Sequence, residues 1–179
     1  QAVLSPLGLP CNPPPWGMLH AVDMATGKRV WTTRLGTTED LAFGLALKTG
    51  TPNAGGPLAT AGGLVFISAA LDNYLRAFDS ATGKELWSAR LPAGGQAGPM
   101  TYEWRGRQYV VIAAGGHAEA KTKPGDYVVA FALPAPGEAA PSAIERAFNR
   151  PGTRLAASVL GALALLAAAA VFLARRQRR

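Results

Sequence analysis

The sequence predicts an all-β propeller body followed by one C-terminal transmembrane helix, and three observations carry this prediction. An eleven-residue motif occurs twice, 56 residues apart. Short apolar runs alternate with glycine-rich turns through the first 134 residues, without a long stretch of helical periodicity. A run of about 20 residues without charge or proline lies near the C-terminus, long enough to cross a bilayer as a helix.

The repeated motif predicts a strand, a tight turn and a second strand that carries a tryptophan. Residues 21–31 (AVDMATGKRVW) recur as residues 77–87 (AFDSATGKELW), with seven of eleven positions identical. The aspartate can accept hydrogen bonds from the amides of the turn, and the glycine can adopt a positive φ. Two unrelated hairpins are the alternative, which the seven identities disfavour. A period near 50 residues is typical of radial or stacked repeats, in which Trp31 and Trp87 would pack against the neighbouring unit.

The short apolar runs are expected to be strands. Residues 19–22 and 74–78 precede the two copies of the turn, and residues 30–35 and 86–91 follow it as return strands. Five further strands are expected because each is a short apolar run bounded by turn residues, and two of them form a hairpin that turns at Gly106. These five are residues 58–60, 63–68, 100–104, 108–113 and 127–133.

The strands group as the second half of one blade, one complete four-stranded blade and three strands of a last blade. The last blade has no copy of the tryptophan motif, so we expect its missing outer strand to come from the other end of a longer chain. Too few blades are present to close a ring, and the chain begins at Gln1 without a signal peptide. We therefore interpret it as the C-terminal part of a larger protein, inactive on its own.

Charge and cysteine content exclude some functions. The net charge is +7, but the segment 138–179 holds seven arginines against two glutamates, so most of the excess lies in the tail. The body has no basic stripe interleaved with aromatic residues, and nucleic acid is not expected as a partner. The single cysteine, Cys11, cannot pair within the chain. It could pair with a cysteine upstream or remain a buried thiol, and the second is expected, without a role.

The apolar run near the C-terminus predicts a membrane anchor. Residues 155–174 are followed by the basic sequence RRQRR, which places the C-terminus in the cytoplasm and the β-body outside. Three arginines on the other flank weaken this orientation, and a buried helix of a soluble domain is the alternative, which the absence of a polar face disfavours. The predicted organisation is a β-body (1–134), a Pro/Ala-rich linker (135–153) and a transmembrane helix with a basic tail (154–179).

Eleven segments between residues 5 and 134 stand out, among them GTPN at 50–53, GGH at 115–117 and GDY at 125–127. Together they resemble the C-terminal end of membrane-bound quinoprotein glucose dehydrogenases, which use pyrroloquinoline quinone (PQQ). The tryptophan motif is shared with many propellers, whereas GTPN-x-GG at 50–56 and GGH at 115–117 before GDY at 125–127 are more specific. The segments are residues 5–8, 10–12, 14–17, 50–53, 55–57, 72–77, 90–96, 99–102, 108–111, 115–117 and 125–127.

The resemblance implies an eight-bladed β-propeller of quinoprotein type, with PQQ on its axis beside a divalent metal, Ca or Mg. It implies oxidation of glucose or another aldose to its lactone, in which a carboxylate base takes the hydroxyl proton and hydride passes to the quinone. Electrons would pass to ubiquinone. The expected location is the bacterial inner membrane, with the propeller in the periplasm and sugar, ubiquinone and the lipid bilayer as partners. The catalytic base and the metal ligands are expected upstream of this chain.

Four residues are candidates for the cofactor site. By resemblance, Asp72 matches an aspartate near PQQ that is implicated in electron transfer, and His117 matches a histidine that supports PQQ binding. From the residues alone, Asp72 is favoured as a turn-capping aspartate, and a loop histidine is more often merely exposed. Gly115 and Gly116 would let the backbone approach a ligand closely. Asn53 and Thr51 in the glycine-rich loop could line the cofactor, or form a plain turn.

Two alternatives to a glucose dehydrogenase stay open. The first is a quinate or polyol dehydrogenase of the same architecture, since most substrate contacts would lie upstream. The second is a non-enzymatic propeller scaffold, which would keep the tryptophan motif without needing the GGH or GTPN segments. The chain also departs from the family, whose anchor is usually N-terminal, because about 45 residues with a predicted membrane span follow Pro134.

Overall fold

The computed structural model describes residues 5–6, 9–41 and 44–134. Throughout these ranges the regular structure consists of strands. A helix long and apolar enough to span a bilayer does not occur among them. The predicted linker (135–153) and transmembrane helix (154–179) lie outside the described residues. Cys11 is exposed, so the expectation of a buried thiol is wrong.

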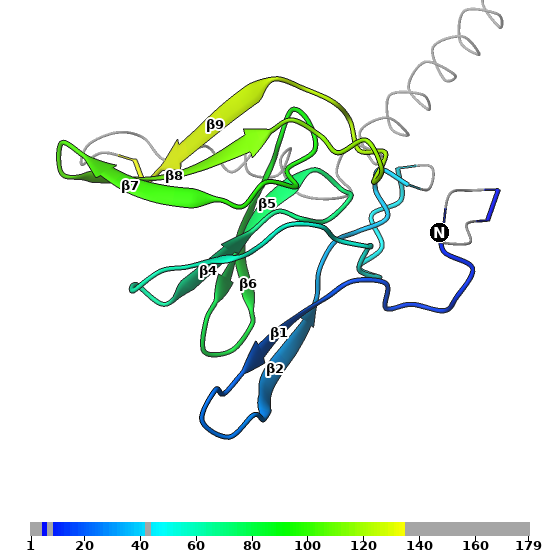
Figure 1. Cartoon of the computed structure of the whole chain (residues 1–179), viewed down its shortest axis with the longest axis horizontal. Helices are drawn as coiled ribbons and strands as arrows, with labels where there is room; N and C mark the ends of the chain where they lie inside the picture. The colour runs from blue at the N-terminus through cyan, green and yellow to red at the C-terminus, as the bar shows by residue number, and fades with distance from the viewer. Residues whose placement is uncertain (1–4, 7–8, 42–43, 135–179) are drawn as a thin grey trace, which may run out of the picture.

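In the described part of the chain, nine strands form three antiparallel sheets that fan out in space (Figure 1). The sheets have two, four and three strands, which confirms the predicted grouping. The first sheet pairs β1 (Met18–Val22) with β2 (Arg29–Arg34); the second has the order β3 (Leu58–Ala59), β4 (Leu64–Ile67), β5 (Tyr74–Asp79) and β6 (Glu85–Arg90); the third has the order β7 (Met100–Trp104), β8 (Arg107–Ala114) and β9 (Tyr127–Ala132).

The turns form as the repeat predicts. Asp79 Oδ1 accepts hydrogen bonds from the backbone amides of Ala81 at 3.0 Å and Thr82 at 2.8 Å, and the exposed Asp23 makes the equivalent bonds in the first sheet. The hydrogen bonds from Thr82 hold the pKa of Asp79 below its ordinary value. Gly83 has a φ of 70°, which a residue with a side chain adopts only with strain. At the predicted β7–β8 hairpin, Gly106 likewise has a φ of 72°.

Each tryptophan of the repeat packs against the sheet that follows it. The indole Nε1 of Trp31 on β2 donates a hydrogen bond to the carbonyl oxygen of Ser80 at 2.8 Å. Its ring lies so close to Gly83 that an added Cβ there would sit 2.5 Å from Trp31 Cε3. Trp87 on β6 meets Phe131 on β9 edge to face, with ring centroids 5.2 Å apart. The tryptophans therefore join neighbouring sheets, as expected.

This packing gives a test of the repeat architecture. Gly83→Ala should destabilise the fold by about 2–4 kcal/mol, because it combines a strained positive φ with a clash against the Trp31 ring. Gly63→Ala is the matched control, since Gly63 has a φ of 78° and its nearest neighbour, Ser80 Oγ, would lie 3.7 Å from the added Cβ. Unfolding midpoints of the full-length variants measure the difference. Equal losses at both positions would contradict tryptophan docking at Gly83.

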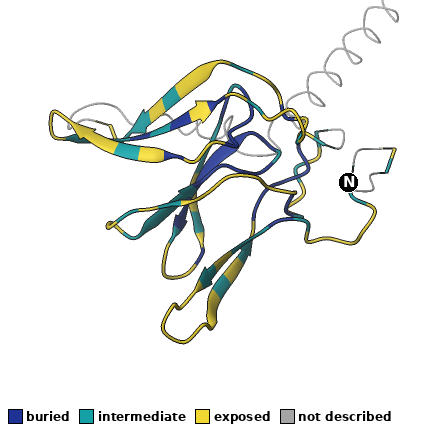
Figure 2. Ribbon diagram, viewed as in Figure 1, coloured by how far each residue is buried: buried dark blue, intermediate teal, exposed yellow. Residues whose placement is uncertain are grey.

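The core lies on both faces of the second sheet, and β5 is buried along most of its length (Figure 2). Leu75 packs in a cluster with residues of the third sheet, such as Val110 and Ile112. Phe78 packs in a second cluster with Leu35, the first residue after β2. Because strand side chains alternate between faces, Tyr74 and Arg76 share the face of Phe78 and point toward the first sheet.

The long connections lie at one end of the three sheets. Short turns join β1 to β2, β3 to β4, β5 to β6 and β7 to β8, and these point away from the long loops in Figure 1. The long loops follow β2, β4, β6 and β8 and comprise residues 35–57, 68–73, 91–99 and 115–126. All four sequence-predicted site residues lie on them.

Candidate functional site

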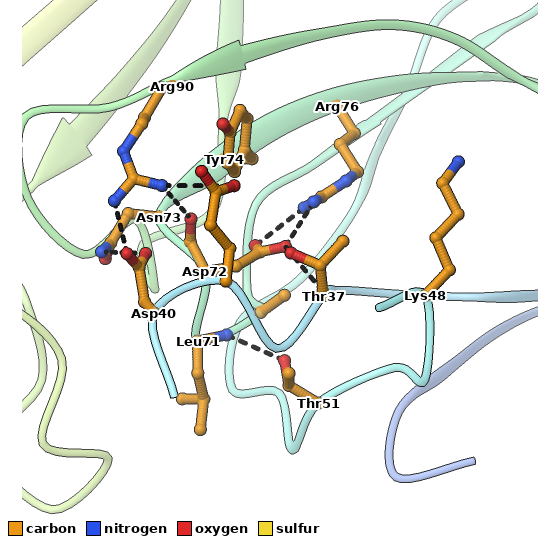
Figure 3. Close-up of polar contacts among 12 residues, drawn as sticks. Thr37, Asp40, Lys48, Thr51, Leu71, Asp72, Asn73, Tyr74, Arg76 and Arg90 are labelled. Carbon is orange, nitrogen blue, oxygen red and sulfur yellow. Dashed lines mark hydrogen bonds and ion pairs between the residues drawn. The ribbon is translucent and has the colours of Figure 1, made fainter. Parts of the chain in front are cut away.

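The loop after β4 holds Asp72 fully buried, against the loop after β2. Its Oδ2 accepts hydrogen bonds from the backbone amide of Thr37 at 2.7 Å and from the Thr37 hydroxyl at 3.0 Å. The guanidinium of Arg76 binds both carboxylate oxygens, with Nη1 3.0 Å from Oδ1 and Nη2 in contact with Oδ2 (Figure 3). Asp72 thus bonds to another loop and to β5 rather than to amides of its own turn.

Arg76 is a buried cation inside the core strand β5. Besides Asp72, its guanidinium approaches Glu85 Oε1 at 3.8 Å and lies over the Tyr74 ring, 5.1 Å from the centroid. Burial lowers the pKa of Arg76, but Asp72 and Glu85 outweigh it, so the net pKa shift is upward. Lys48 extends the chain of charges to the surface with an ion pair to Glu85 at 3.2 Å.

A second group of charges lies on the other side of Tyr74 (Figure 3). Arg90 on β6 lies over the Tyr74 ring at 5.3 Å and binds Asp40 Oδ1 at 2.5 Å, with Glu39 Oε2 3.7 Å away. Asn73 donates a hydrogen bond to Asp40 Oδ2 at 2.9 Å. Burial, and next the nearby Glu39 carboxylate, raise the pKa of Tyr74. Asp40 and Asn73 thus join the loops after β2 and β4 a second time.

Thr51 and Asn53 lie in the loop after β2 but in different surroundings. Thr51 is fully buried, and its hydroxyl accepts a hydrogen bond from the backbone amide of Leu71 at 3.0 Å. Asn53 is exposed and forms an isolated β-bridge with Ala70. The GTPN segment therefore braces the loop that carries Asp72, while Asn53 keeps an accessible carboxamide.

His117 is exposed on the loop after β8. Its Nδ1 accepts a hydrogen bond from the backbone amide of Ala120 at 3.3 Å, which places the ring proton on Nε2. Among the described residues nothing bonds to that Nε2, so the imidazole offers a donor at the loop surface. The backbone amide of His117 donates to the Thr122 hydroxyl at 2.9 Å. The Ala120 amide thus contacts the ring itself, and Thr122 holds the backbone that carries it.

The sequence did not predict the residues that form hydrogen bonds to these candidate side chains and their loops. Thr37 contacts Asp72 across 35 residues of sequence, and no local pattern indicates that pairing. Arg76 had a usable signal, because an arginine inside a buried apolar strand needs a buried carboxylate partner. Gln96 and Thr122 are nearly buried and hydrogen-bonded to each other. Gln96 lies in the resembling segment 90–96 without a predicted role, and Thr122 lies in none of the resembling segments. Within the described part of the chain, acidic, histidine and cysteine side chains form no cluster suited to a metal.

Comparison with known proteins agrees with this architecture. The family model for the PQQ glucose/ethanol/alcohol dehydrogenase β-propeller domain matches residues 1–110. A solved quinohemoprotein alcohol dehydrogenase from Comamonas testosteroni is similar to 74% of this chain, which covers 18% of that structure, with 29% identity and a TM-score of 0.51.

Curated relatives are more similar in sequence. Quinoprotein glucose dehydrogenase A of Acinetobacter calcoaceticus is 57% identical over 75% of this chain, and quinoprotein glucose dehydrogenase of Escherichia coli is 53% identical over 73%. A probable quinate dehydrogenase of Xanthomonas campestris is 52% identical over 73% of the chain. The chain spans about 17% of the length of each of these relatives. The chain therefore belongs to the PQQ family of glucose/ethanol/alcohol dehydrogenase β-propeller domains.

Proposed function

We propose that this chain is the C-terminal part of a PQQ-dependent dehydrogenase that oxidises glucose or another aldose to its lactone and passes electrons to ubiquinone. The observation that carries the proposal is the 57% identity to a quinoprotein glucose dehydrogenase over 75% of this chain. A divalent metal, Ca or Mg, would accompany PQQ, with its ligands and the catalytic base in other parts of the whole protein.

The described loops fit a PQQ-binding role in their chemistry. PQQ carries carboxylate and carbonyl oxygens, which need hydrogen-bond donors. His117 offers Nε2–H and Asn53 offers its carboxamide, both exposed at the same end of the sheets. Asp72 and Thr51, whose side chains are fully buried, would shape this end of the molecule from behind. When bound, PQQ would supply the two-electron acceptor, while the donors of His117 and Asn53 would orient it.

A quinate or polyol substrate is the second candidate. Identity to the probable quinate dehydrogenase is 52%, and identity to a glycerol dehydrogenase large subunit of Gluconobacter oxydans is 53%. These values lie close to those of the glucose enzymes, so this part of the chain does not separate the substrates by identity alone. A propeller scaffold without activity is not favoured, because the relatives named here are all dehydrogenases.

We also propose that the protein is held in the bacterial inner membrane, with the propeller in the periplasm and the C-terminus in the cytoplasm. The uncharged run at 155–174 and the basic residues after it support this placement. The bilayer would then bring the quinone acceptor to the enzyme.

The test is cofactor-dependent activity of the full-length protein. Membranes that contain the apoprotein should oxidise glucose with an artificial electron-accepting dye only after PQQ and Ca²⁺ or Mg²⁺ are added, and chelation before PQQ addition should prevent this. Quinate and glycerol, assayed in parallel, distinguish the second candidate. Absence of PQQ-dependent oxidation of every sugar, polyol and quinate tested would overturn the proposal.

A further inference from the structure

A chain of buried hydrogen bonds links the His117 loop to the rest of the candidate site. The Thr122 hydroxyl accepts a hydrogen bond from the His117 backbone amide at 2.9 Å and donates its own proton to Gln96 Oε1 at 2.8 Å. Gln96 Nε2 then donates to the carbonyl oxygen of Ala70 at 3.2 Å. Ala70 precedes Leu71, whose amide donates to the buried hydroxyl of Thr51. This series of hydrogen bonds therefore connects His117 to the loop that carries Asp72.

The hydrogen-bond donors and acceptors in this series restrict which residues can occupy positions 96 and 122. Gln96 and Thr122 are each only 9% exposed. The hydroxyl of Thr122 must both accept and donate, and the amide of Gln96 must present oxygen to Thr122 and nitrogen to Ala70. Glutamate at 96 would face the Ala70 carbonyl with an oxygen and bury a charge. Valine at 122 would keep the shape but leave the His117 amide and Gln96 Oε1 without this partner.

The backbone around these hydrogen bonds is tightly packed. Gly94 donates to the carbonyl of Lys123 at 2.9 Å, and Gly116 donates to the carbonyl of Gly94 at 2.9 Å, so the loops after β6 and β8 are clamped together. A Cβ on Gly94 would lie 2.4 Å from Thr122 Oγ1 and 2.5 Å from Gln96 Oε1. The absence of a side chain at Gly94 thus provides the room for the hydrogen bond between Thr122 and Gln96.

We infer that Thr122 and Gln96 are positioning residues, which hold the His117 imidazole where its Nε2 meets the cofactor and which tie this loop to the one carrying Asp72. The inference rests on the proposed PQQ-binding function. It assigns the two residues no contact with substrate or cofactor. They act through His117, so their effect should disappear when the imidazole is removed.

The test is a double-mutant cycle on PQQ binding by the full-length apoprotein, followed by quenching of intrinsic fluorescence. Thr122→Val removes both hydrogen bonds of this hydroxyl and should weaken PQQ binding about threefold to tenfold, because the His117 loop is then held less firmly in its binding position. Thr122→Ser keeps the hydroxyl and should bind as the unmodified protein does. In a His117→Asn background, Thr122→Val should have no further effect. Gln96→Met removes the hydrogen bonds that Gln96 makes to Thr122 and to the Ala70 carbonyl oxygen. It serves as a second probe if Thr122→Val does not fold.

Each outcome has a distinct meaning. Equal PQQ affinity of Thr122→Val and Thr122→Ser, or an undiminished effect of Thr122→Val in the His117→Asn background, would overturn the positioning role alone. An unchanged affinity in His117→Asn itself would remove His117 from the cofactor site and the inference with it. Failure of the unmodified apoprotein to bind PQQ would overturn the proposed function. Unfolding midpoints, measured in parallel, separate a positioning effect from general destabilisation.

Discussion

Replacement of Arg76 by methionine is expected to destabilise the fold by about 3–5 kcal/mol. The guanidinium is 2% exposed and is paired with the fully buried carboxylate of Asp72. Methionine fills similar space on β5 but leaves Asp72 with only its two bonds from Thr37. An unpaired buried carboxylate loses its hydration without compensation, which is why removal of one partner costs more than the pair itself contributes. The unfolding midpoint of the full-length protein in guanidinium chloride measures the loss.

Lys48→Met provides the matched control. Lys48 pairs with Glu85 at 3.2 Å, but its side chain is 69% exposed, so the loss should be at most about 1 kcal/mol. The double variant Asp72→Asn/Arg76→Met should be less destabilised than the sum of the two single variants, because it removes the buried charge. A loss in Arg76→Met as small as that in Lys48→Met would show that Asp72 is not buried as a charge against Arg76.

Replacement of His117 by asparagine should raise the PQQ concentration needed for half-maximal activity about tenfold to a hundredfold, with little change in the unfolding midpoint. A hydrogen bond to a charged group contributes about 1.5–3 kcal/mol, and this converts to the stated factor. The asparagine carboxamide ends near the position of Nδ1 and does not reach that of Nε2. The stability effect should be small because His117 is exposed and its loop is held by Thr122 and by backbone hydrogen bonds.

The second histidine of the chain provides the control for this variant. His20 is exposed on β1, and its Nδ1 lies 2.9 Å from the Thr32 hydroxyl on β2. It lies on the opposite face of the strand from Leu19, which packs against the core. His20→Asn should leave the PQQ requirement unchanged. PQQ titrations of dye-linked glucose oxidation compare the two variants. Equal requirements in both would separate His117 from cofactor binding.

Much of the fold follows from short-range signals. The Asp-x-x-Thr-Gly turn is fixed within five residues, since Asp79 bonds to the amides of Ala81 and Thr82 and Gly83 supplies the positive φ. Apolar runs between such turns form the strands, and their boundaries differ from the predicted ones by at most one residue. The repeat also indicated that Trp31 and Trp87 join neighbouring sheets, because two copies of one unit need a shared means of packing.

Only some residues of the candidate site were predicted from the sequence. His117 and Asn53 were expected on loops, and the structure leaves both exposed, in the loops after β8 and β2. The sequence favoured Asp72 as a turn cap, whereas its carboxylate bonds to Thr37 and Arg76. The partners that decide this environment are separated from Asp72 in sequence or hidden on a strand, so local turn chemistry could not identify them.

By itself, then, the amino-acid order determined the units: strand, turn and tryptophan, repeated at a fixed spacing, with segments shared with quinoprotein dehydrogenases. Tertiary structure alone decided how the loops between those units meet, including the Asp72–Arg76–Thr37 cluster and the Gln96–Thr122 chain. The physical reason is the separation in sequence between the residues that interact. Turns and strands are set by hydrogen bonds and burial over a few residues, whereas a buried charge or amide is satisfied by whichever partner the packed sheets bring within about 3 Å.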